Sequence, residues 1–268
     1  MKSIADYHNH TFLCGHAIGE PSEYVDYALK IGLKEIGFSD HAPLVCHDDP
    51  TITMSLEQLP RYHKMIEDVQ KKYQGQDIKI RLGIEADFVP GFEEKTKTIL
   101  DGYAYDYVIG SVHFIGDFAF DNPAQKERLK TNDIDKVYRD YHELLRQSAQ
   151  SGLFDIMAHV DLVKKFGDRP IGDLTDDIKA TADVFKKTGV VIEINSSGLR
   201  KPVGEIYPSL SVLKIYCETG VPITFGSDSH APDEVGFKFE QALGLARQAG
   251  YREYVLFEKR QISEKVKL

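Results

Sequence analysis

The chain repeats one kind of segment seven times, and this repetition limits the fold more than any other feature of the sequence. Each segment is a short run of apolar and β-branched residues that ends in a cluster of histidine, aspartate, glutamate or asparagine. The runs cover residues 4–10, 35–41, 78–87, 107–113, 156–161, 190–195 and 222–230. Most of them lack the polar alternation of a half-exposed strand, so we expect strands that are buried on both faces, as in a parallel sheet.

Stretches with helical spacing of apolar residues separate these runs. They cover residues 22–31, 59–73, 134–149, 178–187, 209–218 and 239–249. A glycine follows five of the six, where a left-handed residue commonly ends a helix: Gly32, Gly152, Gly189, Gly220 and Gly250. Seven β/α units predict a parallel barrel or a doubly wound sheet. The last apolar run, residues 254–257, fits either an eighth strand or a surface segment.

The position of the polar clusters favours the barrel. All seven lie at the C-terminal ends of their runs, and in a parallel barrel those ends converge on one mouth where active sites are built. A doubly wound sheet would spread them along an edge that is useful mainly at its switch point. Barrels of this kind commonly have about 250 residues. We therefore expect the 268 residues to form a single domain, 1–268, of class α/β.

The polar clusters contain a set of side chains that can bind metal ions. His8 and His10 are two residues apart in a strand, so their imidazoles point to one side, roughly 6–7 Å apart. The other runs add further ligands, so that seven of the ten histidines lie at strand ends or in the first loop. The candidate ligands are His8, His10, His16, His41, Glu85, His113, His159, Asp228 and His230. The remaining histidines, His47, His63 and His142, are predicted to lie on the solvated surface.

Nine ligands exceed what one catalytic zinc ion uses, which is three protein ligands and a water. We expect two to three divalent first-row ions, and a site rich in imidazole and poor in thiolate suits Zn, Fe or Mn. Glu85 is the expected bridge between two ions. Cys14 is either a further ligand or a small buried residue. Four aspartates are expected to orient imidazoles or to cap strand ends: Asp6, Asp40, Asp87 and Asp161.

Composition excludes several other classes of protein. Lys and Arg number 33 and Asp and Glu 42, giving a net charge of −9, which argues against binding to a nucleic-acid backbone. The three cysteines form no C-x-x-C pair, which favours a reducing compartment over a disulfide framework. The first residues do not resemble a signal peptide, and no run of about 18 apolar residues is present. We therefore expect a cytoplasmic protein that does not contact a membrane.

The ligand pattern, with Asp40-His41, Gly83-x-Glu85, Ser111-x-His113 and Ser227-Asp228-x-His230, resembles the polymerase-and-histidinol-phosphatase (PHP) superfamily. Four further segments resemble its histidinol-phosphate phosphatase branch: residues 13–17, 83–88, 164–167 and 195–200. The resemblance runs from about Asp6 to Gly236. It implies a distorted (β/α)7 barrel that binds three ions. One ion would be held by His8, His10, Glu85 and Asp228, a second by Glu85, His113 and His159, and the third by His16, His41 and His230.

The resemblance implies hydrolysis of a phosphomonoester, and two or three ions a few Å apart can activate a hydroxide for attack on phosphorus. Cations near the mouth are expected to bind the phosphate: Arg200, Lys164 and Lys165. Phe12, Phe114 and Phe118 are candidates for an apolar wall, and Phe118 is the one we assign to the substrate. Asp40, Asp161 and Arg200 are the candidates for a direct catalytic role. The expected substrate is L-histidinol phosphate.

Three alternatives remain open at this point. A PHP nuclease or nucleotide phosphatase would use the same ions, although the net charge disfavours a long polymer. A hydrolase of the amidohydrolase type would also begin with H-x-H, but would carry a bridging Lys or Glu on the fourth strand, where this chain has His113. A metal-binding module without catalysis is the third. The chain has no G-x-S-x-G elbow and no Walker loop, so a serine nucleophile and a P-loop lack support.

Overall fold

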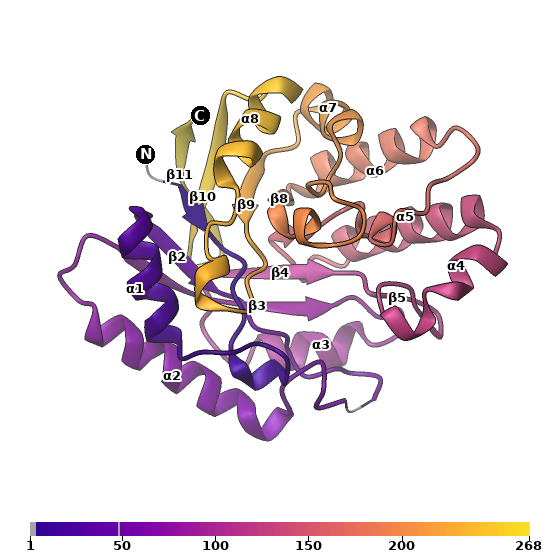
Figure 1. Cartoon of the computed structure of the whole chain (residues 1–268). Helices are drawn as coiled ribbons and strands as arrows, with labels where there is room; N and C mark the ends of the chain where they lie inside the picture. The colour runs from indigo at the N-terminus through magenta and orange to yellow at the C-terminus, as the bar shows by residue number, and fades with distance from the viewer. Residues whose placement is uncertain (1–3, 48) are drawn as a thin grey trace.

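The computed structural model describes residues 4–47 and 49–268. Seven parallel strands form a nearly closed barrel with helices around it (Figure 1). In sheet order they are β1 (Ala5–Asp6), β2 (Glu35–Phe38), β3 (Lys79–Asp87), β4 (Tyr107–Ser111), β7 (Ile156–Met157), β8 (Val191–Asn195) and β9 (Ile223–Gly226). The predicted seven-stranded barrel is confirmed. The expectation that the N-terminal residues do not form a signal peptide falls partly on residues 1–3, which lie outside the described residues.

The first and last strands approach each other and close the ring. The Tyr7 amide donates to the Phe225 carbonyl at 3.1 Å, and Asn9 forms a parallel bridge with Ser229. The neighbouring strands pair in parallel register, for example Glu85 opposite Ile109 between β3 and β4. Closure brings the ends of β1 and β9 together, so the side chains that follow these two strands share one mouth.

Within residues 4–47 and 49–268, eight α-helices flank the barrel. They are α1 (Pro21–Ile31), α2 (Leu59–Lys72), α3 (Glu93–Leu100), α4 (Glu127–Thr131), α5 (Ile134–Gln150), α6 (Thr175–Thr188), α7 (Leu210–Thr219) and α8 (Phe239–Ala249). Six match predicted helices, whereas α3 and α4 were not predicted because both are short. Short 3₁₀ turns complete the loops: Phe12–Cys14, Leu56–Gln58, Pro123–Gln125, Leu162–Lys164, Ser196–Arg200 and Pro232–Glu234. None of the helices among the described residues has the length and apolar character needed to cross a membrane.

The last apolar run is neither an eighth barrel strand nor a surface segment. It lies in β10 (Glu253–Glu258), which pairs antiparallel with β11 (Gln261–Lys267) in a separate sheet. Residues 254–257 are buried. Ion pairs fix this hairpin to the N-terminal end of the barrel: Arg81 to Glu258 at 3.3 Å and Arg260 to Asp155 at 2.9 Å. The hairpin therefore covers the end of the barrel opposite the mouth. A smaller hairpin, β5 (Phe114–Ile115) with β6 (Phe118–Ala119), follows β4.

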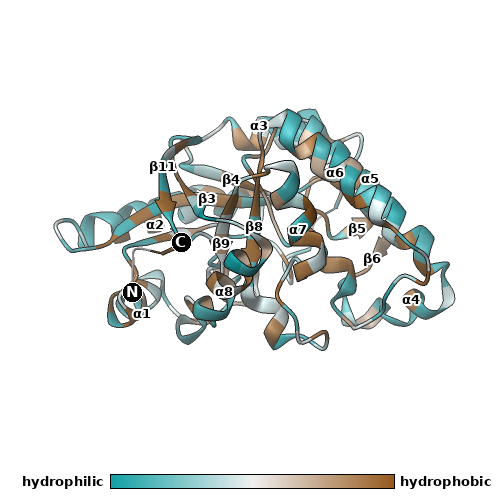
Figure 2. Ribbon diagram, turned by 90° about the horizontal axis from the view of Figure 1, so that it is seen from above, coloured by the Kyte–Doolittle hydropathy of each residue, from teal (hydrophilic) through white to brown (hydrophobic). Residues whose placement is uncertain are grey.

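On the ribbon of Figure 2, the colour of hydrophobic residues lies mainly on the central strands, whereas helices such as α5 and α6 are largely hydrophilic. Apolar side chains fill the barrel and the layer beneath the helices. Two glycines make room for the largest of them. A Cβ at Gly37 would lie 2.1 Å from the Tyr107 hydroxyl, and a Cβ at Gly83 would lie 2.4 Å from the Tyr107 ring. Both strands therefore need glycine at these positions. The Tyr107 hydroxyl then reaches the Tyr7 carbonyl at 2.6 Å. This packing joins β1, β2, β3 and β4 into a rigid support below the mouth.

Candidate metal centre

All nine predicted ligands lie around one cavity at the C-terminal ends of the barrel strands. The cavity has a volume of about 320 Å³ and its wall includes His16, His41, Glu85, His113, His159, Asp228 and His230. His8 and His10 are fully buried beneath it. A parallel bridge between His41 and Glu85 continues the pairing of β2 and β3 to the mouth. Because the C-terminal ends of all the barrel strands meet at one mouth, residues from distant parts of the chain lie together there.

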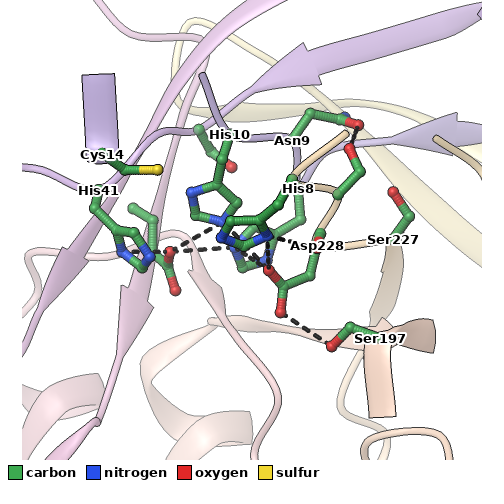
Figure 3. Close-up of polar contacts among 12 residues, drawn as sticks. His8, Asn9, His10, Cys14, His41, Ser197, Ser227 and Asp228 are labelled. Atoms are coloured by element: carbon green, nitrogen blue, oxygen red, sulfur yellow. Dashed lines mark hydrogen bonds and ion pairs between the residues drawn. The ribbon is translucent and has the colours of Figure 1, made fainter. Parts of the chain in front are cut away.

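His8 and His10 form the first ligand group with two carboxylates (Figure 3). The His8 Nε2 lies 3.2 Å from Glu85 Oε2, and the His10 Nε2 lies 3.7 Å from the same oxygen. Asp228 Oδ1 is 3.3 Å from His10 Nε2 and 4.0 Å from His8 Nε2. Ser197 and Asn195 hold the other Asp228 oxygen, at 3.0 and 3.4 Å. These atoms surround one point between β1, β3 and β9.

Glu85 also belongs to a second ligand group. Its Oε1 lies 3.4 Å from His159 Nε2, and ligand atoms of Glu85, His113 and His159 all lie within 4.8 Å of one another. Because Oε2 faces His8 and Oε1 faces His159, the carboxylate lies between two groups. This is the geometry expected of a bridging ligand.

A third group combines His16, His41 and His230, whose ligand atoms also lie within 4.8 Å of one another. The His16 Nδ1 lies 3.0 Å from the Cys14 carbonyl and the His230 Nδ1 lies 3.1 Å from the Asp228 carbonyl. Cys14 is fully buried, and its Sγ lies within 4.8 Å of ligand atoms of His10 and His230. The three groups correspond to the three ligand sets that the family resemblance implied.

Several buried polar atoms at the site fit metal ions better than they fit any partner in the protein. The His8 Nε2, the His10 Nε2 and the Glu85 Oε2 are buried, and none of them has a well-aligned hydrogen-bond partner among the described residues. A buried polar atom without a partner costs free energy. Imidazole nitrogens and carboxylate oxygens that point at a common centre are the donors that divalent first-row ions bind. The residues present therefore fit divalent metal ions.

The charges of the site are consistent with this fit. Burial lowers the pKa of His10, but Asp228 and Asp40 outweigh it and raise the value to about 9. Burial would raise the pKa of Glu85, but His41 and His8 hold it well below its usual range. Burial, together with His10, holds the pKa of His230 well below its usual value. The lowered pKa of Glu85 favours its anionic form, which suits a divalent cation.

Carboxylates outside the ligand groups orient the imidazoles. Asp87 lies 2.8 Å from the His113 Nδ1, and Asp40 lies 3.4 Å from the His10 Nδ1. These contacts are compatible with the positioning role predicted for Asp87 and Asp40. Asp6 contacts no ring; it accepts hydrogen bonds from the Ser227 and Gly236 amides at 2.9 and 2.8 Å. Asp6 therefore braces the loop that carries Asp228 and His230.

Sequence reasoning missed Glu193, which is buried on β8 and lies 2.7 Å from the His8 Nδ1. The signal was present, because Glu193 is the one charged residue in the apolar run 190–195. An acid in a strand buried on both faces needs a partner inside the barrel.

Two ligands have backbone conformations that are unusual for residues other than glycine. His159 has φ of 27° and Asp228 has φ of 52°. Such conformations cost about 1–3 kcal/mol each and are concentrated at functional sites. Arg200 holds the second of them, because its Nη2 donates to the Ser227 and Asp228 carbonyls at 3.0 and 2.8 Å.

The predicted phosphate-binding cations have different positions. Arg200 and Lys165 line the cavity. Lys165 pairs with Asp121 at 3.0 Å, and the Arg200 Nη1 is buried without a hydrogen-bond partner among the described residues. Lys164 instead is buried below the mouth, 2.8 Å from Asp161 and 2.9 Å from the Ile206 carbonyl. The structure therefore supports Lys165 and Arg200, but not Lys164, as residues that can meet a substrate.

Asp40 and Asp161 do not line the cavity, so the direct catalytic role expected of them lacks structural support. Asp40 lies behind His10, and Asp161 accepts from the Ser209 amide at 2.8 Å in addition to its ion pair. Of the aromatic candidates, Phe118 is buried. The Arg128 guanidinium carbon lies over its ring, 4.6 Å from the ring centroid. Phe114 rather than Phe118 lines a cavity beside the metal centre. Phe114 and Phe118 were harder to assign because both lie in the short hairpin of β5 and β6 that follows β4, outside the barrel strands.

The three remaining histidines differ in their exposure to solvent. His47 is exposed, as predicted. His63 and His142 were expected on the surface, but both are buried, with exposed fractions of 4% and 3%. His63 stacks on Tyr103 with ring centroids 3.5 Å apart, and His142 lies 3.2 Å from the Thr181 hydroxyl. Each lies on the inner face of its helix, where an imidazole packs as a flat, partly apolar ring.

A parallel barrel whose strand ends converge on three groups of histidine and carboxylate ligands defines a metal-dependent barrel enzyme. The model of the PHP domain family matches residues 6–197. A protein of Deinococcus radiodurans named "Probable histidinol-phosphatase" is 42% identical over 254 residues, which cover 94% of this chain and 96% of that protein. The histidinol-phosphatase of Bacillus subtilis is 31% identical over 262 residues, which cover 89% of this chain and 97% of that protein. The chain belongs to the PHP family, in the branch that contains these proteins.

A solved structure agrees with the fold. The crystal structure of histidinol phosphate phosphatase from Lactococcus lactis, complexed with zinc, L-histidinol and phosphate, matches with a TM-score of 0.83. It is 23% identical and covers 98% of this chain and 99% of that chain. Nearly the whole length of both chains therefore has one architecture.

Proposed function

We propose that residues 1–268 form one metal-dependent phosphoesterase domain that hydrolyses L-histidinol phosphate to L-histidinol and phosphate. The observation that carries the proposal is the shared cavity, where three ligand groups face the cationic side chains of Arg200 and Lys165. The choice of substrate is supported by the names of the Deinococcus and Bacillus relatives and by the ligands of the Lactococcus protein.

We propose that two to three divalent ions, Zn, Fe or Mn, occupy the ligand groups. His8, His10, Glu85 and Asp228 would hold one ion, and Glu85, His113 and His159 a second. His16, His41 and His230 would hold the third. When bound, such ions lower the pKa of a water molecule toward neutrality and neutralise the charge of the phosphoryl oxygens.

The chain's own cations would bind and orient the phosphate. The Arg200 guanidinium is fixed by Glu234 at 3.1 Å and by the two carbonyls of the Asp228 turn. This arrangement leaves Nη1 as the nitrogen without a partner, on a side chain that lines the cavity. A guanidinium nitrogen with a free N–H suits a phosphoryl oxygen. Lys165 and Lys201 contribute further positive charge to the same wall.

A second cavity, of about 370 Å³, suits the organic part of the substrate. It shares His16, His41, His113, Asp121 and Lys165 with the first cavity. Its other lining residues include the carboxylates of Asp49 and Asp87 and the ring of Phe114. Carboxylates attract an ammonium group, and an aromatic ring can stack on an imidazole. Histidinol phosphate carries a phosphate, an ammonium group and an imidazole, so its charges match the two cavities.

A phosphate-release assay with metal-reconstituted protein tests the proposal. L-histidinol phosphate, nucleoside monophosphates, p-nitrophenyl phosphate and a 5′-phosphorylated oligonucleotide would be compared at equal metal loading. We expect the highest kcat/KM for L-histidinol phosphate. If nucleotides or oligonucleotide ends are hydrolysed at least as efficiently, the substrate assignment is wrong and a nucleotide phosphatase is favoured. If none of the esters is hydrolysed, the phosphoesterase proposal fails.

A further inference from the structure

Glu193 is placed inside the barrel by the strands on either side of it. It lies in β8 with an exposed fraction of 1%, in register with Thr224 of β9, and its carboxylate reaches Gly226 of the same strand. A Cβ at position 226 would lie 1.8 Å from the Glu193 Oε1, so the carboxylate occupies the space that this glycine leaves free. Because its surroundings are fixed strands, its two oxygens have fixed directions.

The two oxygens of Glu193 serve two different ligand groups. Oε1 lies 2.7 Å from the His8 Nδ1. Oε2 accepts a hydrogen bond from the His159 backbone amide at 3.2 Å and another from the Asn195 side chain at 2.9 Å. His8 belongs to the first ligand group and His159 to the second, and Glu85 joins the same two groups.

The contact with His8 determines which ring nitrogen faces the ligand group. The Glu193 Oε1 is placed to accept a hydrogen bond from the His8 Nδ1, so the other ring nitrogen, Nε2, faces the ligand group, 3.2 Å from Glu85. The contact with the His159 amide holds a residue whose φ of 27° is unfavourable. One side chain thus orients an imidazole ring in one group and holds a strained backbone in the other.

We infer that Glu193 is a positioning residue that couples metal binding in the two ligand groups joined by Glu85. This inference rests on the metal-binding part of the proposed function. It requires that both oxygens of residue 193 are acceptors: a change that removes one acceptor weakens one group directly and the other through Glu85, which joins them.

Substitution of Glu193 by glutamine separates this role from a role in packing. Glutamine has nearly the same volume but offers one oxygen and one NH₂ group. If the oxygen faces His8, the NH₂ group meets the His159 amide, which is also a donor. If the NH₂ group faces His8, the ring must accept at Nδ1 and carry its proton on Nε2, where no ion can then bind. Aspartate is shorter but keeps two acceptors.

The test measures the ions retained per chain after dialysis against graded concentrations of a chelator, for zinc- and manganese-loaded protein. We expect Glu193→Gln to lose its ions at roughly 10- to 100-fold lower chelator concentration than the wild type, with the two ions lost together. Glu193→Asp should retain ions better than Glu193→Gln. The matched control is Glu35→Gln, a buried strand glutamate at the other end of the barrel that binds Tyr7 and Arg81. It should retain ions like the wild type.

Circular dichroism and thermal unfolding in excess metal establish that each variant is folded. Wild-type retention in Glu193→Gln would overturn the inference, and so would loss of one ion only. If Glu193→Asp loses its ions at least as readily as Glu193→Gln, side-chain volume and not the pair of acceptors matters, which also overturns it. A wild-type protein that holds no ion would instead contradict the proposed function.

Discussion

The Nε2 atoms of His16 and His230 face each other at 3.0 Å, although 214 positions separate the two residues. The Nδ1 of each ring lies at hydrogen-bond distance from a carbonyl, which only a protonated ring nitrogen can satisfy. A neutral imidazole then has a lone pair at Nε2, so two lone pairs point at each other. A cation bound by both nitrogens removes the repulsion, and this relationship joins the loops that follow the first and last strands.

We therefore expect His16→Gln to lower the metal content by one ion per chain and to leave the other ions bound. His16 belongs to the third ligand group alone and has no contact with Glu85 in the other two. Elemental analysis of the purified, reconstituted variant measures the loss. His47→Gln is the control, because His47 is an exposed histidine outside all three groups. An unchanged metal content in His16→Gln would contradict the assignment of the third group.

Glu85→Gln should be the most damaging single change to metal content. The two oxygens of Glu85 face different groups, His8 on one side and His159 on the other. An amide lacks the negative charge and offers only one acceptor, so both groups lose a ligand. The expected result is loss of two ions in elemental analysis and loss of phosphatase activity. A variant that keeps full occupancy would exclude the bridging role.

Arg200→Ala should lower kcat/KM by roughly 10- to 1000-fold, the loss of one charge-assisted contact that strengthens in the transition state. The metal content should remain, because Ser197 and Asn195 still hold Asp228. Arg200→Lys should recover only part of the activity, since an ammonium group cannot replace a planar guanidinium. Steady-state kinetics and elemental analysis on the same preparations are the measurements. A fall in metal content would show that Arg200 acts through the Asp228 turn instead.

The barrel and the convergence of the nine candidate ligands on one cavity could be predicted because both follow from one local pattern. A buried strand that ends in a polar residue needs no knowledge of its neighbours, and parallel topology then brings the ends together. Glu193 could not be assigned a role in this way, since its partner His8 is 185 positions away. The strand pattern places His8 at a strand end. Only the arrangement of β8 beside β9 shows that the Glu193 carboxylate orients the His8 ring.

Loop residues were less predictable for the same reason. Lys164 and Lys165 are adjacent in sequence, and nothing local distinguishes the one that is buried from the one that lines the cavity. The 3₁₀ turn Leu162–Lys164 decides it by turning Lys164 toward Asp161. The prediction that His63 and His142 lie on the surface was wrong. The inner face of each helix was assigned from its apolar and tyrosine side chains, and the two histidines lie on that face as well.

The two lysines should respond differently to the same substitution. Lys164→Met leaves the buried Asp161 carboxylate without its cation, so we expect a loss of unfolding free energy of roughly 3–5 kcal/mol. Lys165→Met should leave stability nearly unchanged and raise KM about 10-fold, because Lys165 lines the cavity. Chemical denaturation and steady-state kinetics of both variants check this. Equal effects of the two substitutions on KM would contradict the different positions of the two side chains.

Protonation of the buried His142 should lower the free energy of unfolding in mild acid relative to its value at neutral pH. Burial, together with Arg146, lowers the pKa of His142 to about 4, whereas an unfolded chain has the ordinary value of about 6.5. Between these two values the unfolded state binds more protons than the folded state, so stability rises with pH there. The contribution is fully present above pH 6.5 and is lost as the pH falls toward 4. From pH 7 to pH 5 the expected loss is about 2 kcal/mol.

Replacement of His142 by glutamine removes this titration and keeps a polar group near the Thr181 hydroxyl. We therefore expect the unfolding free energy of His142→Gln to fall by about 2 kcal/mol less than that of the wild type between pH 7 and pH 5. His47→Gln provides the control, because His47 is an exposed histidine outside the core. Urea denaturation of the three proteins at both pH values measures the difference. Parallel losses in all three would show that the buried ring of His142 does not resist protonation.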